Sequence, residues 1–222
     1  GLSEPQKGRL LFSELRCVSC HASESVQQKK GPDLSLVGSR VNPDYIQNFI
    51  ANPHSVDPGT QMPDLLADNP KRDEIAEALT HYLVSRSGKP FVEGVVNQGR
   101  IGEGKKLFER IGCVNCHMPG KGVELSHVPT KYGVDSLTEF LFQPLHARPS
   151  GRMPDMNLTR EEAKSIASYL IGLKAVKLSE FKPEAAKITA GKQYFQKLNC
   201  VSCHELDGTK GNPSLTLDKL RA

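Results

Sequence analysis

Apolar side chains recur at helical spacing along most of the chain, and no run of useful length alternates as a strand would. Three short stretches, each ending just before a cysteine pair, show this most clearly. Positions three or four residues apart share one face of a helix. The apolar residues of the three stretches are Leu10, Leu11, Phe12 and Leu15; Leu107, Phe108 and Ile111; and Tyr194, Phe195 and Leu198. The pattern predicts three short amphipathic helices.

Two longer helices are predicted further along, each with a start signal. Asn69 and Pro70 precede the first, and Thr159 with Glu162 forms a capping box for the second. Their apolar stripes are Ile75, Leu79, Tyr82 and Leu83, and Ile166, Tyr169, Leu170 and Leu173. Shorter helical stretches are expected around residues 45–50 and 137–141. The predicted fold class is all-α.

The predicted elements form a repeat. A glycine stands nine residues before the first cysteine of each pair, and a phenylalanine stands five before it. These residues are Gly8, Gly104 and Gly191, and Phe12, Phe108 and Phe195. Segments 85–97 and 174–183, rich in Gly, Ser, Lys and Pro, are the predicted linkers. The chain is therefore expected to hold one domain at residues 1–88, a second at 89–178, and the front part of a third at 179–222.

All six cysteines belong to Cys-x-x-Cys-His motifs, which is the attachment signal for c-type haem. The motifs are Cys17, Cys20 and His21; Cys113, Cys116 and His117; and Cys200, Cys203 and His204. Two thiols three residues apart on a helical turn can form thioethers with the two vinyl groups on one porphyrin edge. The next residue then offers its imidazole to the iron. The sequence predicts three covalently attached haems c, with His21, His117 and His204 as iron ligands.

Three alternative roles for the cysteines fit the sequence less well. A disulfide framework would not append a histidine to every pair. A thioredoxin-type motif needs a βαβ context, which the sequence lacks. Zinc ribbons place their cysteine pairs much closer together than these pairs lie.

A sixth ligand for two of the irons is predicted from methionine. Met62 and Met153 each begin a Met-Pro-Asp string, and each string precedes the closing helix of its repeat. Thioether sulfur is a common haem ligand that raises the potential. Met156 competes with Met153 for the second iron. Met118 directly follows His117 and cannot reach the opposite face of the haem.

Composition excludes several classes of protein. The formal charge is only +4, and the basic residues are spread along the chain, so a nucleic-acid partner is not expected. No apolar run approaches the roughly 20 residues that cross a bilayer. The chain begins at Gly1 rather than Met, and a removed signal peptide is the expected reason.

In these motifs the chain resembles class I cytochromes c in tandem. The resemblance covers two whole domains and the front of a third. It implies a few helices around each covalent haem, His/Met ligation, and transfer of single electrons outside the cytoplasm, in the periplasm or a similar compartment. It also implies that the Pro32 carbonyl bonds His21 and fixes its tautomer. Pro213 matches Pro32 in the third repeat, whereas Gly122-Val123 stands there in the second, which leaves the partner of His117 open.

The third repeat departs from this pattern because only 18 residues follow His204 and none is methionine. Its haem is expected to be more exposed and lower in potential, and to be either five-coordinate or completed by further C-terminal residues or by a neighbouring subunit. His54, His127 and His146 are weaker candidates for its distal ligand. The predicted function is that of a non-enzymatic electron carrier between redox partner proteins. The alternative is a haem enzyme, peroxidase-like or sulfur-oxidising, with catalysis at the third haem.

Overall fold

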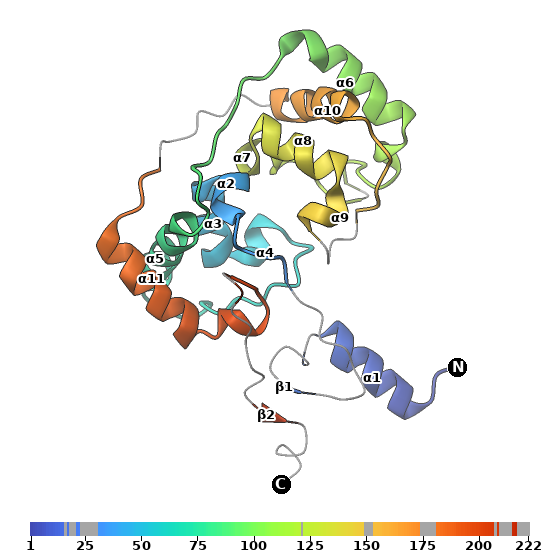
Figure 1. Cartoon of the computed structure of the whole chain (residues 1–222). Helices are drawn as coiled ribbons and strands as arrows, with labels where there is room; N and C mark the ends of the chain where they lie inside the picture. The colour runs from blue at the N-terminus through green and yellow to red at the C-terminus, as the bar shows by residue number, and fades with distance from the viewer. Residues whose placement is uncertain are drawn as a thin grey trace.

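The structure is a computed structural model of the chain, and it describes residues 1–15, 17, 21–22, 31–120, 122–148, 153–173, 181–206, 208 and 215–216. The described part is helical, as predicted, apart from one two-residue parallel pair of β1 (His21–Ala22) with β2 (Leu215–Thr216). Most helices gather into two compact groups, and α1 lies outside both (Figure 1). No helix of the described part is both long and apolar enough to cross a membrane.

The first group is formed by the second repeat alone. It contains α6 (Gln98–Arg110), the short turn η2 (Cys113–Asn115), α7 (Val128–Lys131), α8 (Val134–Phe142), α9 (Pro144–Ala147) and α10 (Arg160–Gly172). Helices α6 and α10 pack closely where a Cβ on Gly104 would lie 2.0 Å from the Ser165 carbonyl oxygen. Beside this contact the rings of Phe108 and Tyr169 are 5.8 Å apart. The repeated glycine and phenylalanine therefore serve helix packing.

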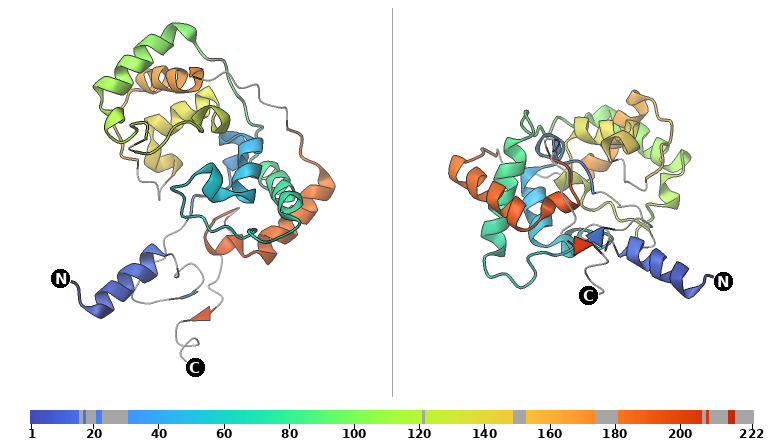
Figure 2. Two further views of the ribbon diagram at one scale, coloured as in Figure 1. Left: turned by 180° about the vertical axis from the view of Figure 1, so that it is seen from behind. Right: turned by 60° about the horizontal axis from the view of Figure 1, so that its bottom comes forward.

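The second group combines the first repeat with the third. It contains α2 (Val37–Arg40), α3 (Pro43–Ala51), α4 (Pro53–Val56), α5 (Arg72–Ser85), α11 (Ala185–Lys197) and the short turn η3 (Cys200–Ser202). Helix α11 lies along α5 in both views of Figure 2. A Cβ on Gly191 would lie 2.0 Å from the Ala78 carbonyl oxygen, and the rings of Tyr82 and Phe195 are 5.6 Å apart. The contact between α11 and α5 thus reproduces the contact between α6 and α10.

Helix α1 (Glu4–Glu14) has the same place in the first repeat as α6 has in the second, but none of its residues is buried. Leu10 and Leu11 are 50% and 57% exposed. The segment expected to begin a third domain, α11, packs on α5 of the first repeat, in the place equivalent to that of α6 on α10.

The helix start at Thr159 agrees with the sequence, and the one at Asn69 differs. The capping box of α10 is present, with Thr159 N–H donating to Glu162 and Glu162 N–H donating to Thr159. The capping box of α1, at Ser3, is present as well. Asn69 does not cap α5, which begins at Arg72. Its side chain accepts instead from Lys71 N–H at 2.9 Å, a local turn that delays the helix.

Backbone hydrogen bonds join the two groups of helices. Asn42, which is 3% exposed, donates its backbone N–H to Lys131 and its side-chain amide to Thr130. On the other side of the junction, Val134 N–H donates to the Glu93 carbonyl in the linker between α5 and α6. The linker is therefore held against the first group, and the loop before α3 in the second group is held against α7 in the first.

Candidate functional site

Two of the three Cys-x-x-Cys-His motifs adopt the same short helical turn. In η3 the His204 N–H donates to the Cys200 carbonyl at 3.0 Å, and in η2 the His117 N–H donates to Cys113 at 2.9 Å. Each turn follows a residue with positive φ, which redirects the chain after the preceding helix. The turn sets the two cysteines one turn apart with the histidine next to the second. This is the spacing that haem attachment requires.

The imidazoles of these two motifs are oriented by carbonyl groups. Nδ1 of His204 lies 3.0 Å from the Pro32 oxygen, and Nδ1 of His117 lies 3.0 Å from the Val123 oxygen. A carbonyl can only accept, so Nδ1 carries the proton and Nε2 is left to bind a metal. The sequence left the partner of His117 open, and Val123 supplies it because a backbone carbonyl needs no particular side chain.

The bond from Pro32 differs from the one expected. The resemblance implied that Pro32 would bond His21, whereas in the structure its carbonyl accepts from His204. The loop before α2 fits the third motif closely, since a Cβ on Gly31 would lie 2.6 Å from Cε1 of His204. The difference follows from the docking of α11 on α5, which brings η3 and His204 to residues 31–34.

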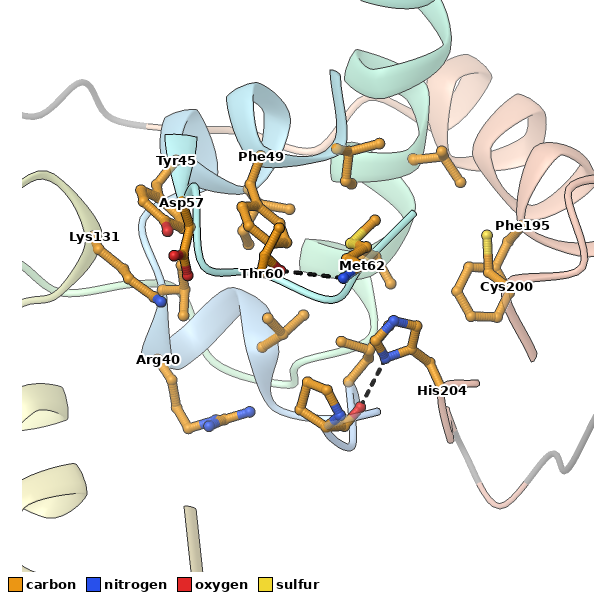
Figure 3. A pocket seen from close by; sticks show the side chains of 18 of the residues that line it. Arg40, Tyr45, Phe49, Asp57, Thr60, Met62, Lys131, Phe195, Cys200 and His204 are labelled. Carbon is orange, nitrogen blue, oxygen red and sulfur yellow. Dashed lines mark hydrogen bonds between the residues drawn. The ribbon is translucent and has the colours of Figure 1, made fainter. Parts of the chain in front are cut away.

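Met62 and His204 line the same cavity, as Figure 3 shows. Met62 comes from the loop before α5, and His204 follows η3. The cavity has a volume of about 1140 Å³ out to its open mouth, and its walls are largely apolar. Apolar wall residues include Ile46, Phe49, Leu66, Leu79, Leu83 and Phe195. Apolar walls with a sulfur and an imidazole among them fit a porphyrin with axial ligands.

The far end of the cavity is polar and positively charged. Arg40, Lys131 and Arg148 line it together with Asp57 and Tyr45, so cations outnumber the carboxylate. Burial is the largest cause of each shift there: it lowers the pKa of Lys131 to about 8 and raises the pKa of Tyr45. Arg148 and Arg40 lower the pKa of Lys131 further by repulsion.

Two buried polar atoms at this end lack a protein partner. Within the described part of the chain, Nε of Arg40 and the hydroxyl of Tyr45 are buried without a hydrogen bond. A buried polar atom left without a partner costs about 1–3 kcal/mol. Haem propionates would accept from both atoms and would balance the surplus of positive charge. The residues present therefore fit haem at the apolar walls and at the polar end.

The structure describes the remaining predicted haem-binding residues only in part. Cys17 is half-buried, Cys20 lies outside the described residues, and only the backbone of His21 is described, in β1. Pro213 also lies outside them. Met153 and Met156 are both half-buried against the core, so packing alone does not choose between them. Met118 is 43% exposed.

Of the three histidines considered as distal ligands, one lies near the cavity. His127 stands 6.0 Å from the Tyr45 ring, centroid to centroid, while His54 and His146 are exposed. Burial and the neighbouring Lys131 lower the pKa of His127. His127 therefore sits at the polar end of the cavity, which is the end suited to propionates.

The polar end was not found from the sequence. Arg40, Lys131 and Arg148 are single basic residues in two different repeats, and nothing in their spacing links them. The sequence places Tyr45 in the short helical stretch around residues 45–50, beside the apolar Ile46 and Phe49. A phenol at a core position was the one available signal, because its hydroxyl requires a partner when buried.

The thiols do not resemble those of a disulfide exchange enzyme. Burial raises the pKa of Cys200 to about 11 and also raises that of Cys113. Reactive Cys-x-x-Cys motifs need the opposite shift, toward the thiolate. Among the described residues no three His, Cys, Asp or Glu side chains gather as a metal cluster.

Comparison with known proteins decides the family. The family model described as Cytochrome c matches residues 5–87 and 188–221, which is more than half of the chain. The chain belongs to the cytochrome c family. Members of this family carry covalently bound haem c and transfer electrons through its iron. The two matched stretches are the ones that the structure packs together around the cavity.

Two curated relatives are subunits of larger enzymes. The chain is 31% identical over 98 residues to a subunit of the nitric oxide reductase of Paracoccus denitrificans, across 38% of this chain and 65% of the relative. It is 40% identical over 60 residues to the CcoP subunit of the Cbb3-type cytochrome c oxidase of Helicobacter pylori (strain ATCC 700392 / 26695), across 27% of this chain and 20% of the relative. The chain thus spans less than two thirds of either relative. No solved structure matches significantly.

Replacing Lys131 with glutamine is expected to lower the midpoint potential of the haem in the cavity. Loss of one positive charge from the polar end would favour the ferric form, by roughly 1.4 kcal/mol for a charge separation on the order of 12 Å at an effective dielectric constant of ~20. This corresponds to about 60 mV for one electron. A spectroscopic redox titration measures the shift, with Lys105→Gln on the exposed side of α6 as the control. Equal shifts in both variants would contradict the assignment of the polar end.

Proposed function

We propose that this cytochrome c passes single electrons between redox partner proteins outside the cytoplasm, through three covalently attached haems. Each haem iron, when bound, supplies the one-electron change between its ferrous and ferric states. The rest of the chemistry belongs to the polypeptide, which sets the potential through axial ligands, burial and charge.

The proposed roles follow the motifs. Cys17, Cys20, Cys113, Cys116, Cys200 and Cys203 hold the haems by thioether bonds. His21, His117 and His204 bind iron on one face, and Met62 and Met153 bind two of the irons on the other. Carbonyl groups keep the Nδ1 protons of His117 and His204 in place, which directs Nε2 toward the iron and makes it more basic.

One observation carries the proposal. The cavity presents an oriented imidazole and a thioether together, His204 and Met62, among apolar side chains. An iron with both axial positions filled has no position for a substrate, so such a site suits electron transfer rather than catalysis. The apolar walls also exclude water, which favours the less charged ferrous form and raises the potential.

The proposed partners and cellular location are inferred from the two relatives. Both are named as subunits of reductase or oxidase enzymes. This chain accordingly works in, or next to, a larger redox complex, with donor and acceptor proteins at exposed haem edges. Covalent attachment requires reduced thiols and haem together, and in c-type cytochromes this takes place outside the cytoplasm.

A haem enzyme is the second candidate, supported by the count of ligands. Three motifs offer a histidine, but only two Met-Pro-Asp strings exist, so one iron lacks a matched methionine. That iron could accept a small ligand. Stoichiometric binding of carbon monoxide together with peroxide turnover would favour the enzyme over the carrier.

The intact mass of the matured chain tests the number of haems. We expect a denatured mass of 24.4 kDa plus three haem masses, because thioether bonds survive denaturation. The double variant Cys113→Ser/Cys116→Ser should lose one of the three. A fully matured preparation that carries two haems or fewer would contradict the proposal.

A further inference from the structure

We infer that Met62 and His204 bind the same iron, so that the first and third repeats build one haem site and helix α1 (Glu4–Glu14) stands outside it. This inference rests on the proposed function and deepens it, because it argues which histidine and which methionine share an iron. The order of the motifs along the chain would pair Met62 with His21. Four sets of contacts favour His204.

The first is the packing of helix on helix. Gly191 of α11 meets the backbone of α5 at Ala78, in the same geometry as Gly104 of α6 against Ser165 of α10. Gly8 is the corresponding residue of α1, and a Cβ there would meet nothing within 4 Å. Helices α1 and α11 both carry this glycine, and of the two it is α11 that packs against α5 through it.

The second is the loop around the imidazole. Gly31 N–H donates to the Cys203 carbonyl at 2.7 Å, and Leu34 N–H donates to Glu205 at 2.9 Å. With the bond between His204 and Pro32, these contacts place the third motif on residues 31–34. The second repeat repeats the arrangement within itself, where Val123 N–H donates to Cys116 at 2.9 Å.

The third set of contacts is an ion pair near the start of α11. Nζ of Lys187 on α11 lies 2.7 Å from a carboxylate oxygen of Glu77 on α5. Counting back from the cysteines, Glu4 of α1 holds the position equivalent to Lys187. If α1 docked in the same register, Glu4 would face Glu77, and two carboxylates would replace an ion pair. The charge pattern therefore favours α11 over α1 in this groove.

The fourth is the anchor before α11. His81, which is 4% exposed, accepts at Nδ1 from the Glu184 N–H at 3.0 Å, and its ring lies 4.6 Å from that of Phe181. Glu184 is the N-cap residue of α11. A buried side chain of the first repeat thus fixes the start of the helix from the third.

The pairing of Met62 with His204 changes which haem lacks a methionine ligand. With Met62 given to His204 and Met153 to His117, neither Met-Pro-Asp methionine remains for the haem on Cys17 and Cys20. The sequence alone assigned the exposed, ligand-accepting haem to the third motif, whereas the shared site assigns it to the first.

Removing the first haem while keeping the chain whole tests the pairing. In Cys17→Ser/Cys20→Ser we expect two haems, a ferric far-red sulfur-to-iron charge-transfer band from both, and no uptake of cyanide. Adding Met62→Ala should halve the band and let one iron per chain bind cyanide. The shared site would be overturned by two results together: the Cys17→Ser/Cys20→Ser variant already binds one equivalent of cyanide, and adding Met62→Ala leaves its band unchanged. The proposed function would still stand, because it fails only if the haems or the Met153-dependent part of the band are missing.

A second measurement uses the unaltered protein and excludes an effect of haem removal. Amide hydrogen exchange of the matured chain should show residues 185–197 protected about as well as residues 98–110, with residues 4–14 exchanging at least tenfold faster. Protection of residues 4–14 with fast exchange in 185–197 would place α1 in the groove and overturn the inference.

Discussion

Gly191→Ala is expected to destabilise the chain by about 2–3 kcal/mol, whereas Gly8→Ala should stabilise α1. Inside a helix, exchange of glycine for alanine gains up to about 1 kcal/mol from propensity alone. At Gly191 the new Cβ would lie 2.0 Å from the Ala78 oxygen and 2.7 Å from the Tyr82 Cβ. The backbone of α5 has to move, and overpacking of this kind costs more than the propensity gain. At Gly8 the Cβ meets open space, so only the gain remains.

The second repeat supplies a matched pair for this comparison. Gly102 and Gly104 lie in the same helix, α6, but a Cβ on Gly102 meets nothing within 4 Å, whereas one on Gly104 meets the Ser165 carbonyl. Denaturant unfolding, followed by haem absorbance, should therefore show a similar loss in the free energy of unfolding for Gly191→Ala and Gly104→Ala. Gly8→Ala and Gly102→Ala should both show no loss. If Gly8→Ala were the destabilising change and Gly191→Ala the neutral one, the first repeat would be closed by its own helix.

Met153→Ala is expected to lower the potential of the second haem by on the order of 0.1–0.2 V, part of the ~0.8 V that axial ligands control. Thioether ligation favours ferrous iron, and water or hydroxide in its place favours ferric. The variant should also lose its share of the far-red sulfur-to-iron band. Redox titration and the ferric spectrum measure the two effects on the same sample.

Two other methionines serve as controls for this change. Met156 is half-buried and lies three residues after Met153 in the chain, and its replacement by alanine should alter packing but leave the band in place. Met118 is 43% exposed, so Met118→Ala should change neither stability nor potential. Loss of the band in Met156→Ala, with Met153→Ala unaffected, would show that the Met-Pro-Asp string does not mark the ligand.

The individual helices could be predicted from the sequence because their signals are local. The apolar spacing before each cysteine pair and the capping box at Thr159 lie within a few residues of the helices they specify. Which helix packs on α5 could not be predicted in this way, since α1 and α11 carry the same glycine and phenylalanine. The structure separates them by contacts across about a hundred residues, those of Lys187 with Glu77 and of Glu184 with His81.

The site was predicted in the same uneven manner. Cys-x-x-Cys-His and Met-Pro-Asp are compact strings, so their residues could be named at once. The carbonyl of Val123 has no sequence signature, because every residue offers the same group. The cations at the polar end come from α2, α7 and the loop after α9, and only the packing of the two groups brings them together.

The junction at Asn42 bears on how an electron would move between the haem sites proposed in the two groups of helices. Asn42 is buried and bonded twice to the end of α7, so neither group can turn about the other without breaking these bonds. Tunnelling falls off steeply with the gap between redox centres, and a hinged pair of domains would sample many gaps. Here the bonded junction holds the gap at one value. The rate between the two centres is then a property of the fold and not of diffusion of one domain toward the other.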